Sequence, residues 1–391
     1  MTINSRIKIS PPTADLIRGA QELERTEHGV LPHRLPALAV RQSADPQLRL
    51  AEAQPSGVRV VFRTTATTIE LDTVRSRTTY AGLPARPDGV IELVVDGLLV
   101  ESITTAGGVT TTVSMATGTA TVEEGPVWTS RFTGLAPDAK NVEIWLPHNE
   151  ITELRELRAS APIHAAEPSG RPVWVHHGSS ISHGSNALRP TETWPARAAR
   201  LGEVELINRG FGGSALLDQF TARALRDTPA DLISLKLGIN VVNTDLMRLR
   251  AFRSALHGFL DTVRDGHPET PLLLISPIFC GIHEDTPGPG AFDTDALAAG
   301  ELRFRATGDP AAVAAGALTL RVIREEMRRV VAERAETDAH LHYLDGLELF
   351  AEADELLHPL PDALHPDAAS HVLIGDRFAA LAFGPGGALS S

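Results

Sequence analysis

The chain has 391 residues, of which 42% are hydrophobic and 22% charged, and its formal net charge is −13. This length exceeds what one hydrophobic core usually serves, so we expect two domains. The acidic balance argues against nucleic acid or an anionic membrane surface as a partner, because both require a basic footprint. The sequence also lacks an apolar run of about 18 residues, so we expect no membrane span.

The chain contains a single cysteine, Cys280, which excludes an internal disulfide framework and fits a reducing cytosol. Residues Met1 to Gly19 contain neither the apolar stretch nor the small-residue cleavage site of a secretory signal. We therefore expect a cytoplasmic protein. The oligomeric state is left open.

The first part of the chain has the composition of an all-β protein. After an N-terminal arm over residues 1–29, short β-branched runs alternate with turns such as Asp96-Gly97 and Gly107-Gly108. The runs cover residues 57–63, 68–71, 89–95, 98–103, 109–122 and 141–146. This pattern predicts a jelly-roll-like β-sandwich over residues 30–160, and the Ala-, Pro- and Gly-containing residues 160–172 then form a linker.

The pattern changes in the second part, residues 171–391, where strands alternate with helices. Strands are expected at residues 173–175, 204–207, 231–237, 271–276 and 341–344, and helices at 191–201, 215–226, 246–264, 318–336 and 368–382. This alternation predicts βαβ units and a parallel sheet covered on both faces. In such sheets the chemistry gathers at the carboxyl ends of the strands.

Four short blocks fall at those ends or just before the last helix. They are Gly178-Ser179-Ser180-Ile181-Ser182-His183-Gly184, Asn208-Arg209-Gly210-Phe211-Gly212-Gly213, Leu237-Gly238-Ile239-Asn240 and Asp362-Ala363-Leu364-His365-Pro366. Each block alone is common in proteins of many kinds. Their joint occurrence in this order points to one active site.

With these blocks the chain resembles the GDSL/SGNH hydrolase superfamily, which is named for a Ser, a Gly, an Asn and a His on a flavodoxin-like three-layer sandwich. The resemblance covers roughly residues 171–385. It implies that Ser180 is the nucleophile, that Gly213 and Asn240 are oxyanion donors, and that Asp362 and His365 are the acid–base pair. The usual Gly-Asp-Ser-Leu is here Gly178-Ser179-Ser180-Ile181. The missing Asp is not a triad member, so the departure affects the name more than the mechanism.

The chemistry of these residues is consistent with that assignment. A neutral serine is a poor nucleophile until a positioned base takes its proton, and His365 is the candidate base. Asp362, three residues earlier, can orient His365 through its other ring nitrogen. The oxyanion hole would combine the backbone N–H groups of Ser180 and Gly213 with the side-chain amide of Asn240.

Competing sites have weaker support in the sequence. Ser182 is a rival nucleophile, although Ser180 keeps the register of the motif. No Gly-x-Ser-x-Gly, His-Glu-x-x-His or Walker sequence is present. His176 and His177 are adjacent in an expected strand and therefore point to opposite faces, so no metal site is predicted there.

Residues Phe279 to Gly316 form a long stretch without clear periodicity, which we interpret as a lid or a substrate-shaping loop. Cys280 and His283 near its start, together with His183 after the nucleophile, are candidate substrate-binding residues. A buried, purely structural Cys280 is the alternative.

The arrangement of two domains resembles a group of actinobacterial GDSL enzymes that includes an acyltransferase of tetracycline tailoring. Other enzymes with a jelly roll before an SGNH domain deacetylate carbohydrates. We predict a serine-dependent ester hydrolase that acts on a small acyl ester through an acyl-Ser180 intermediate and needs no cofactor. The alternatives are an acyltransferase with a thioester donor such as acyl-CoA and a hydroxyl acceptor, and a non-catalytic binding protein on the same fold.

Overall fold

The computed structural model describes residues 7–9, 11–114 and 117–390 of the chain. These residues form two compact units. The first comprises residues 1–36, 52–170 and 188–191, and the second comprises residues 37–51, 171–187 and 192–391. In the described part of the chain, no helix combines the length and the apolar character needed to cross a membrane.

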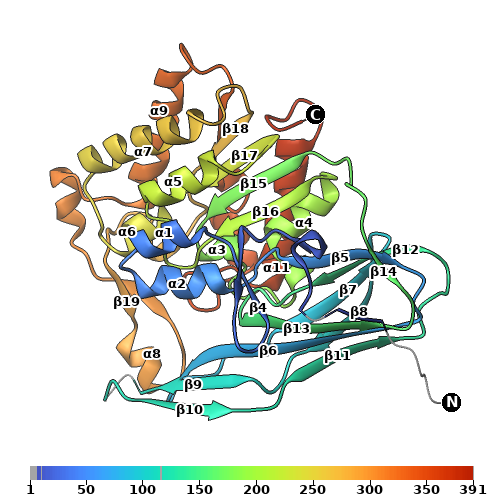
Figure 1. The fold of residues 1–391 in the computed structure, drawn as a ribbon. Coiled ribbons are helices and arrows are strands. Elements are labelled where there is room, and N and C mark those ends of the chain that lie inside the picture. The colour runs from blue at the N-terminus through green and yellow to red at the C-terminus, as the bar shows by residue number, and fades with distance from the viewer. Residues whose placement is uncertain (1–6, 10, 115–116, 391) are drawn as a thin grey trace. The chain divides into compact units, whose positions relative to one another are not determined.

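The first unit contains two β-sheets, which are largely antiparallel (Figure 1). The larger sheet has the order β10-β9-β6-β13-β4-β3, with β1 on β13 and β11 on β6. Its strands are β1 (Ile7–Ile9), β3 (Glu22–Arg25), β4 (Val30–His33), β6 (Thr68–Tyr80), β9 (Val109–Val113), β10 (Ala120–Glu124), β11 (Trp128–Thr133) and β13 (Ile151–Ala159). The smaller sheet has the order β14-β5-β12-β7-β8, with β2 on β5. Its strands are β2 (Ile17–Arg18), β5 (Arg59–Thr64), β7 (Val90–Val95), β8 (Leu98–Thr104), β12 (Lys140–Trp145) and β14 (Ile163–Ala165).

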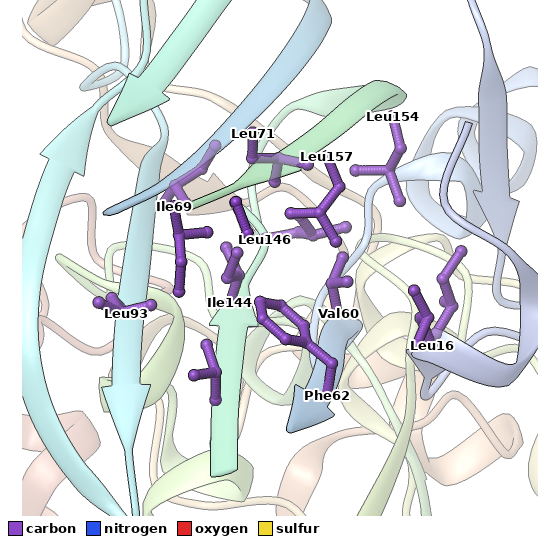
Figure 2. Close-up of a cluster of buried hydrophobic side chains, with 14 of the residues drawn as sticks. Leu16, Val60, Phe62, Ile69, Leu71, Leu93, Ile144, Leu146, Leu154 and Leu157 are labelled. Atoms are coloured by element: carbon purple, nitrogen blue, oxygen red, sulfur yellow. The ribbon is translucent and has the colours of Figure 1, made fainter. Parts of the chain in front are cut away.

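One hydrophobic core joins these two sheets. Figure 2 shows side chains from both sheets directed toward one another. Ile69, Leu71, Leu154 and Leu157 come from the larger sheet, and Val60, Phe62, Leu93 and Ile144 come from the smaller one. All eight are fully buried. Alternation along β5 and β6 places their residues on the inner face. In β13 the irregularity in register between Leu154 and Glu156 brings both Leu154 and Leu157 to that face.

The sheet-rich character predicted for this region is confirmed, although strands β4, β11 and β13 and the second half of β6 were not expected. The jelly-roll connection remains a prediction. The expected N-terminal arm, of which residues 1–6 lie outside the described part, supplies β1, β2 and β3 and the 3₁₀ turn η1 (Ala14–Leu16). The expected linker includes β14. Within residues 30–160, the chain also forms two helices that were not expected, α1 (Ala37–Gln42) and α2 (Pro46–Ala53).

The second unit is built on a five-stranded parallel sheet with the order β16-β15-β17-β18-β21. The strands are β15 (Val173–Gly178), β16 (Glu205–Gly210), β17 (Leu232–Lys236), β18 (Leu272–Ile275) and β21 (Leu341–Leu344). In chain order this is the 2-1-3-4-5 arrangement of flavodoxin-like sheets. The long helices are α4 (Trp194–Leu201), α5 (Gln219–Arg226), α7 (Leu249–Arg264), α9 (Leu320–Arg334) and α11 (Ala368–Phe378), and α11 continues as a π-helical turn, η6 (Ala379–Phe383).

Helices cover both faces of this sheet. On β15 the Trp174 ring stacks against Phe378 of α11 with centroids 5.2 Å apart, and it lies 6.2 Å from Trp194 of α4. His177 faces the other way and stacks on Phe259 of α7 at 5.9 Å. The predicted three-layer arrangement of residues 171–391 is therefore present. The opposite orientation of His176 and His177 follows from the same alternation.

Shorter elements lie between these strands and helices in the chain. They are α3 (Ser180–His183), η2 (Pro190–Glu192), α6 (Ile239–Asn243), η5 (Gly346–Glu348) and α10 (Glu352–Leu357). The stretch predicted as a lid contains η3 (Gly281–His283), β19 (Gly290–Phe292), α8 (Thr294–Ala298), β20 (Phe304–Ala306) and η4 (Pro310–Ala315). Within it, β19 and β20 pair as an antiparallel hairpin.

Residues 37–51 leave the first unit and belong to the second. The points of departure and return are joined by the Glu52 carboxylate, which accepts hydrogen bonds from the N–H groups of Arg34 at 3.2 Å and Leu35 at 3.4 Å. The same carboxylate contacts His33 Nδ1 at 2.7 Å. Glu52 therefore links the two ends of the segment 37–51, here called the 37–51 excursion, which carries α1 and most of α2.

The His33–Glu52 pair predicts a pH-dependent stability. Burial acts to lower the pKa of His33, but hydrogen bonds and charge from Glu52 and Glu24 outweigh it and raise the pKa from 6.5 to about 9. Because the folded-state pKa is the higher one, this contribution is complete below pH 6.5 and is lost as the pH rises through 9. After allowance for solvent screening we expect a loss of about 1–2 kcal/mol.

The measurement is the free energy of unfolding in denaturant across that pH range, together with an NMR titration of the His33 ring. Glu52→Gln should flatten the pH dependence, because Gln still accepts the backbone N–H groups but carries no charge. A Glu52→Gln variant with the slope of the native protein would contradict the assignment.

Candidate active site

The predicted nucleophile lies two residues after the end of β15, which pairs with β16 on one side and β17 on the other. Ser179 caps helix α3, and its side chain accepts a hydrogen bond from the Ile181 N–H. Ser180 is therefore the first residue of that helix, at the carboxyl edge of the sheet. Helix α3 passes very close to β16, because a Cβ at Gly210 would lie 2.5 Å from the backbone nitrogen of His183. Only glycine permits this approach.

The three predicted triad residues come together in the structure. Ser180 Oγ lies 3.0 Å from His365 Nε2, although the residues are 185 positions apart. His365 Nδ1 lies 2.7 Å from Asp362 Oδ2. All three side chains are buried. This is the nucleophile–base–orienting-group geometry that general-base activation of a serine requires.

The loop that carries Asp362 and His365 is tightly folded. Ala363 adopts a left-handed conformation with φ of 64°. This turn lets Asp362 Oδ1 accept hydrogen bonds from the N–H groups of Leu364 at 3.0 Å and His365 at 2.7 Å. Burial acts to raise the pKa of Asp362, but the interactions with His365 and these N–H groups hold it below its ordinary value. Asp362 is therefore ionised and can stabilise an imidazolium.

The predicted oxyanion donors lie on neighbouring loops. Asn240 is buried on helix α6, and its Oδ1 accepts a hydrogen bond from the Ala215 N–H at 3.0 Å. This bond fixes the orientation of the amide and leaves Nδ2 as the outward donor. Gly213 follows β16 and has φ of +76°, a conformation that favours glycine. Asn240 is thus hydrogen-bonded to the loop that carries Gly213.

His176 is the centre of a buried hydrogen-bonded network next to helix α3. The sequence pattern did not predict this network. His176 contacts Ser182 Oγ at 2.8 Å through Nε2 and Ser234 Oγ at 2.7 Å through Nδ1. Trp174 Nε1 donates to the same Ser234 hydroxyl at 2.9 Å. Burial holds the pKa of His176 well below 6.5, so the ring is neutral. The hydroxyl of Ser182 is therefore engaged with His176, on the side of α3 that faces the sheet.

A second buried imidazole ties the last helix to the nucleophile segment. His371 of α11 accepts a hydrogen bond from the Trp194 N–H at 3.2 Å and contacts Ser185 O at 2.9 Å through Nε2. Burial lowers its pKa to about 4. A single histidine within a helical sequence pattern does not indicate that its ring will form hydrogen bonds with other segments.

The three candidate substrate-binding residues are buried and engaged within the protein. His183 Nδ1 accepts a hydrogen bond from the Gly212 N–H at 3.3 Å. Cys280 Sγ donates to Ala363 O at 3.5 Å, and burial raises the pKa of this thiol above its ordinary range. The two nitrogens of His283 contact Thr286 O and Asn243 Oδ1, both at 3.2 Å. Contact of these residues with a substrate remains a prediction.

The hairpin of the predicted lid reaches the triad. The Phe304 N–H donates to Asp362 O at 2.9 Å. Its ring meets His365 edge-on with centroids 5.8 Å apart, and it packs against Phe292 at 5.1 Å. The hairpin thus supports the loop that presents His365. Among the residues that the structure describes, no group of three or more His, Cys, Asp or Glu could hold a metal ion.

Solved structures share this architecture over nearly the whole chain. A salicylyl-acyltransferase from a tetracycline biosynthetic pathway, SsfX3, is 26% identical, covers 95% of this chain and 95% of its own, and superposes with a TM-score of 0.77. A protein from Bacteroides ovatus ATCC 8483 described as a GDSL-like lipase is 18% identical, with 96% of each chain covered and a TM-score of 0.65. The acetyl xylan esterase Est2A from the rumen bacterium Butyrivibrio proteoclasticus shares the fold at 11% identity and a TM-score of 0.53, with 97% of this chain and 98% of its own covered.

No curated protein matches the chain significantly. Residues 177–373, which make up half of the chain, match the GDSL-like Lipase/Acylhydrolase family. The match includes Ser180, Gly213, Asn240, Asp362 and His365, the residues whose geometry is given above. The chain belongs to the GDSL-like lipase/acylhydrolase family.

Proposed function

We propose that this protein is a serine-dependent ester hydrolase that acts on a small acyl ester through an acyl-Ser180 intermediate. The observation that carries the proposal is the chain of contacts from Ser180 Oγ to His365 Nε2 at 3.0 Å and from His365 Nδ1 to Asp362 Oδ2 at 2.7 Å. Family members with this arrangement of residues perform acyl transfer, and the side chains needed for it are all present.

In the proposed reaction, Ser180 Oγ attacks the acyl carbonyl while His365 Nε2 takes the hydroxyl proton. The negative charge that develops on the carbonyl oxygen is stabilised by the N–H groups of Ser180 and Gly213 and by the Asn240 amide. Asp362 stabilises the imidazolium, which then gives its proton to the departing alcohol. Water, deprotonated by His365, attacks the acyl-serine and releases the acid and free Ser180. Side chains and backbone supply every group, so no cofactor is proposed.

An acyltransferase is the second candidate, because the salicylyl-acyltransferase is similar over the full length of both chains. The two activities share the acyl-enzyme and differ in what attacks it. Water at about 55 M competes with an acceptor at about 1 mM, so transfer must favour the acceptor by about 5 × 10⁴, or about 6 kcal/mol, through orientation and exclusion of water. In that case a thioester such as acyl-CoA would be the donor substrate. We also propose a cytoplasmic location, because the single cysteine, which is buried and free, fits a reducing compartment.

The experiment that distinguishes them is intact-mass analysis of the protein mixed with a panel of acyl esters and acyl thioesters, with and without alcohols. Release of free acid at a rate independent of the alcohol supports the hydrolase. Formation of a new ester that increases with alcohol supports the transferase. A protein that forms no acyl adduct, cleaves no p-nitrophenyl acetate and resists a serine-directed phosphonate is neither enzyme.

The identity of the nucleophile gives a first prediction for this site. Ser180→Ala should abolish the covalent adduct with a serine-directed phosphonate, whereas Ser182→Ala should retain it. The reason is that Ser182 Oγ is committed to His176 at 2.8 Å, while Ser180 Oγ faces His365. Intact mass reads the adduct directly. Labelling of Ser180→Ala together with loss of labelling in Ser182→Ala would reverse the assignment.

Asn240 gives a second prediction. Asn240→Ala should lower kcat by about 10²–10³ with little change in KM, since the contact is made mainly in the transition state. Asn240→Asp should be at least as damaging, because it keeps the acceptor for the Ala215 N–H but replaces the donor with a charged oxygen. Thr262→Ala on helix α7 is the control and should keep kcat, since the Thr262 hydroxyl contacts Gln219 and Gly258. Equal kcat values for the two alanine variants would remove Asn240 from the oxyanion hole.

A further inference from the structure

The loop that follows β16 and carries Gly213 has an unusual pattern of backbone hydrogen bonds. Four of its N–H groups donate at 2.8–3.3 Å. They are those of Phe211, Gly212, Ser214 and Ala215, which donate to Gly178 O, His183 Nδ1, Phe211 O and Asn240 Oδ1, respectively. The Gly213 N–H has no acceptor among the residues that the structure describes. Hydrogen bonds therefore hold the loop before and after Gly213, while the Gly213 N–H itself is free.

Two side chains of the 37–51 excursion also form hydrogen bonds with this loop. Gln47 Nε2 donates to Gly212 O at 3.0 Å. The Ser214 hydroxyl donates to Asp45 Oδ2 at 3.2 Å. These contacts act on the residues immediately before and after Gly213. The Gln47 stem also packs there, because its Cγ would lie 3.1 Å from a Cβ at Gly213.

Asp45 and Gln47 are themselves held in place by helix α2. Asp45 Oδ1 accepts the Gln47 N–H at 2.9 Å, so one carboxylate both caps the helix and contacts Ser214. Leu48 and Ala51 of the same helix are each only 1% exposed and anchor it. The two contacts to the loop therefore come from residues at the start of an anchored helix, and the Gln47 side chain itself is exposed.

We propose that Asp45 and Gln47 are positioning residues that aim the Gly213 N–H at the developing oxyanion. The inference rests on the proposed function, because it assigns a role within the same reaction. Both residues lie outside residues 177–373, the part that matches the family, so this chain would supply part of its active-site support from its N-terminal region.

The physical reason is that an oxyanion donor is effective only when it is aimed before the charge develops. The Gly212 carbonyl belongs to the same peptide unit as the Gly213 N–H, and that unit is planar. A hydrogen bond from Gln47 to the carbonyl therefore restricts the direction of the N–H on its other side. Release of the carbonyl lets the peptide unit rotate, and the donor is then aimed correctly for only part of the time.

The test compares variants of Gln47 in the full-length protein. Gln47→Met keeps the length and packing of the side chain but removes the donor, and Gln47→Glu places a carboxylate against the Gly212 carbonyl. We expect kcat per titrated active site to fall about 3- to 10-fold in Gln47→Met and at least as far in Gln47→Glu, with KM nearly unchanged. Ser214→Ala should lower kcat by a similar factor, because it frees the loop from Asp45.

Gln42→Ala is the matched control. Gln42 lies in the same excursion and accepts a hydrogen bond from Arg223 Nη2 at 2.6 Å, but it does not contact the loop. It should keep the native kcat even if it lowers the melting temperature. Titration with a serine-directed phosphonate counts the folded sites in each variant, so a loss of folded protein is not mistaken for a loss of turnover.

The outcomes separate the two proposals. If the native protein is not labelled at Ser180 and turns over no ester, the proposed function fails. If the native protein is labelled and active but Gln47→Met, Gln47→Glu and Ser214→Ala all match Gln42→Ala in kcat, the positioning role is wrong and the proposed function stands. A fall in kcat for Gln47→Glu alone would also overturn the donor role, since Gln47→Met shows that the hydrogen bond is dispensable.

Discussion

In the parallel sheet of the second unit, the last residues of neighbouring strands stand in one hydrogen-bonded row. Gly178 pairs with Gly210 on one side and with Lys236 on the other, and Lys236 pairs with Ile275. Because parallel strands end at the same edge, the segments that follow them begin at the same height. Those segments carry Ser180, Gly213 and Asn240, so the register of the sheet brings the proposed nucleophile and the proposed oxyanion donors to the same edge.

The other half of the triad depends on packing rather than on register. His365 lies three residues before α11, and the position of that helix is set by its contact with the sheet. Phe378 of α11 stacks on Trp174, and Arg377 forms a bidentate pair with Asp354 at 2.6 and 2.9 Å. Since Trp174 belongs to the strand that ends at Gly178, the same strand positions both partners of the Ser180–His365 contact.

The features that could be predicted from the sequence are those that short segments determine. The alternation of apolar runs and helical periods located the strands and helices of the second unit, and the four blocks located the residues that meet at the sheet edge. The opposite orientation of His176 and His177 followed from the geometry of a strand.

The remaining features depend on contacts that are distant in the sequence. Helices α1 and α2 have only 6 and 8 residues, and nothing in them indicates that residues 37–51 belong to the second unit. Strands β19 and β20 have 3 residues each, too few for a period to be recognised. The hydrogen bonds of His176 and His183 arise where separate segments meet, and for this reason single histidines could not be assigned from the sequence.

A folded protein normally pairs its buried backbone N–H groups, and a site that stabilises an oxyanion must leave at least one of them free. In the native state without substrate, the loop would gain a hydrogen bond by turning the Gly213 N–H toward a protein acceptor. Such a rearrangement is opposed only if the adjacent peptide groups already form hydrogen bonds that the rearrangement would break. Here Gly212 is held at its N–H by His183 and at its carbonyl by Gln47, and Ser214 is held by Asp45. The hydrogen bonds on either side of Gly213 therefore have a common effect. Because they restrict the flanking peptide groups, they also restrict rotation of the unpaired Gly213 N–H away from a bound substrate.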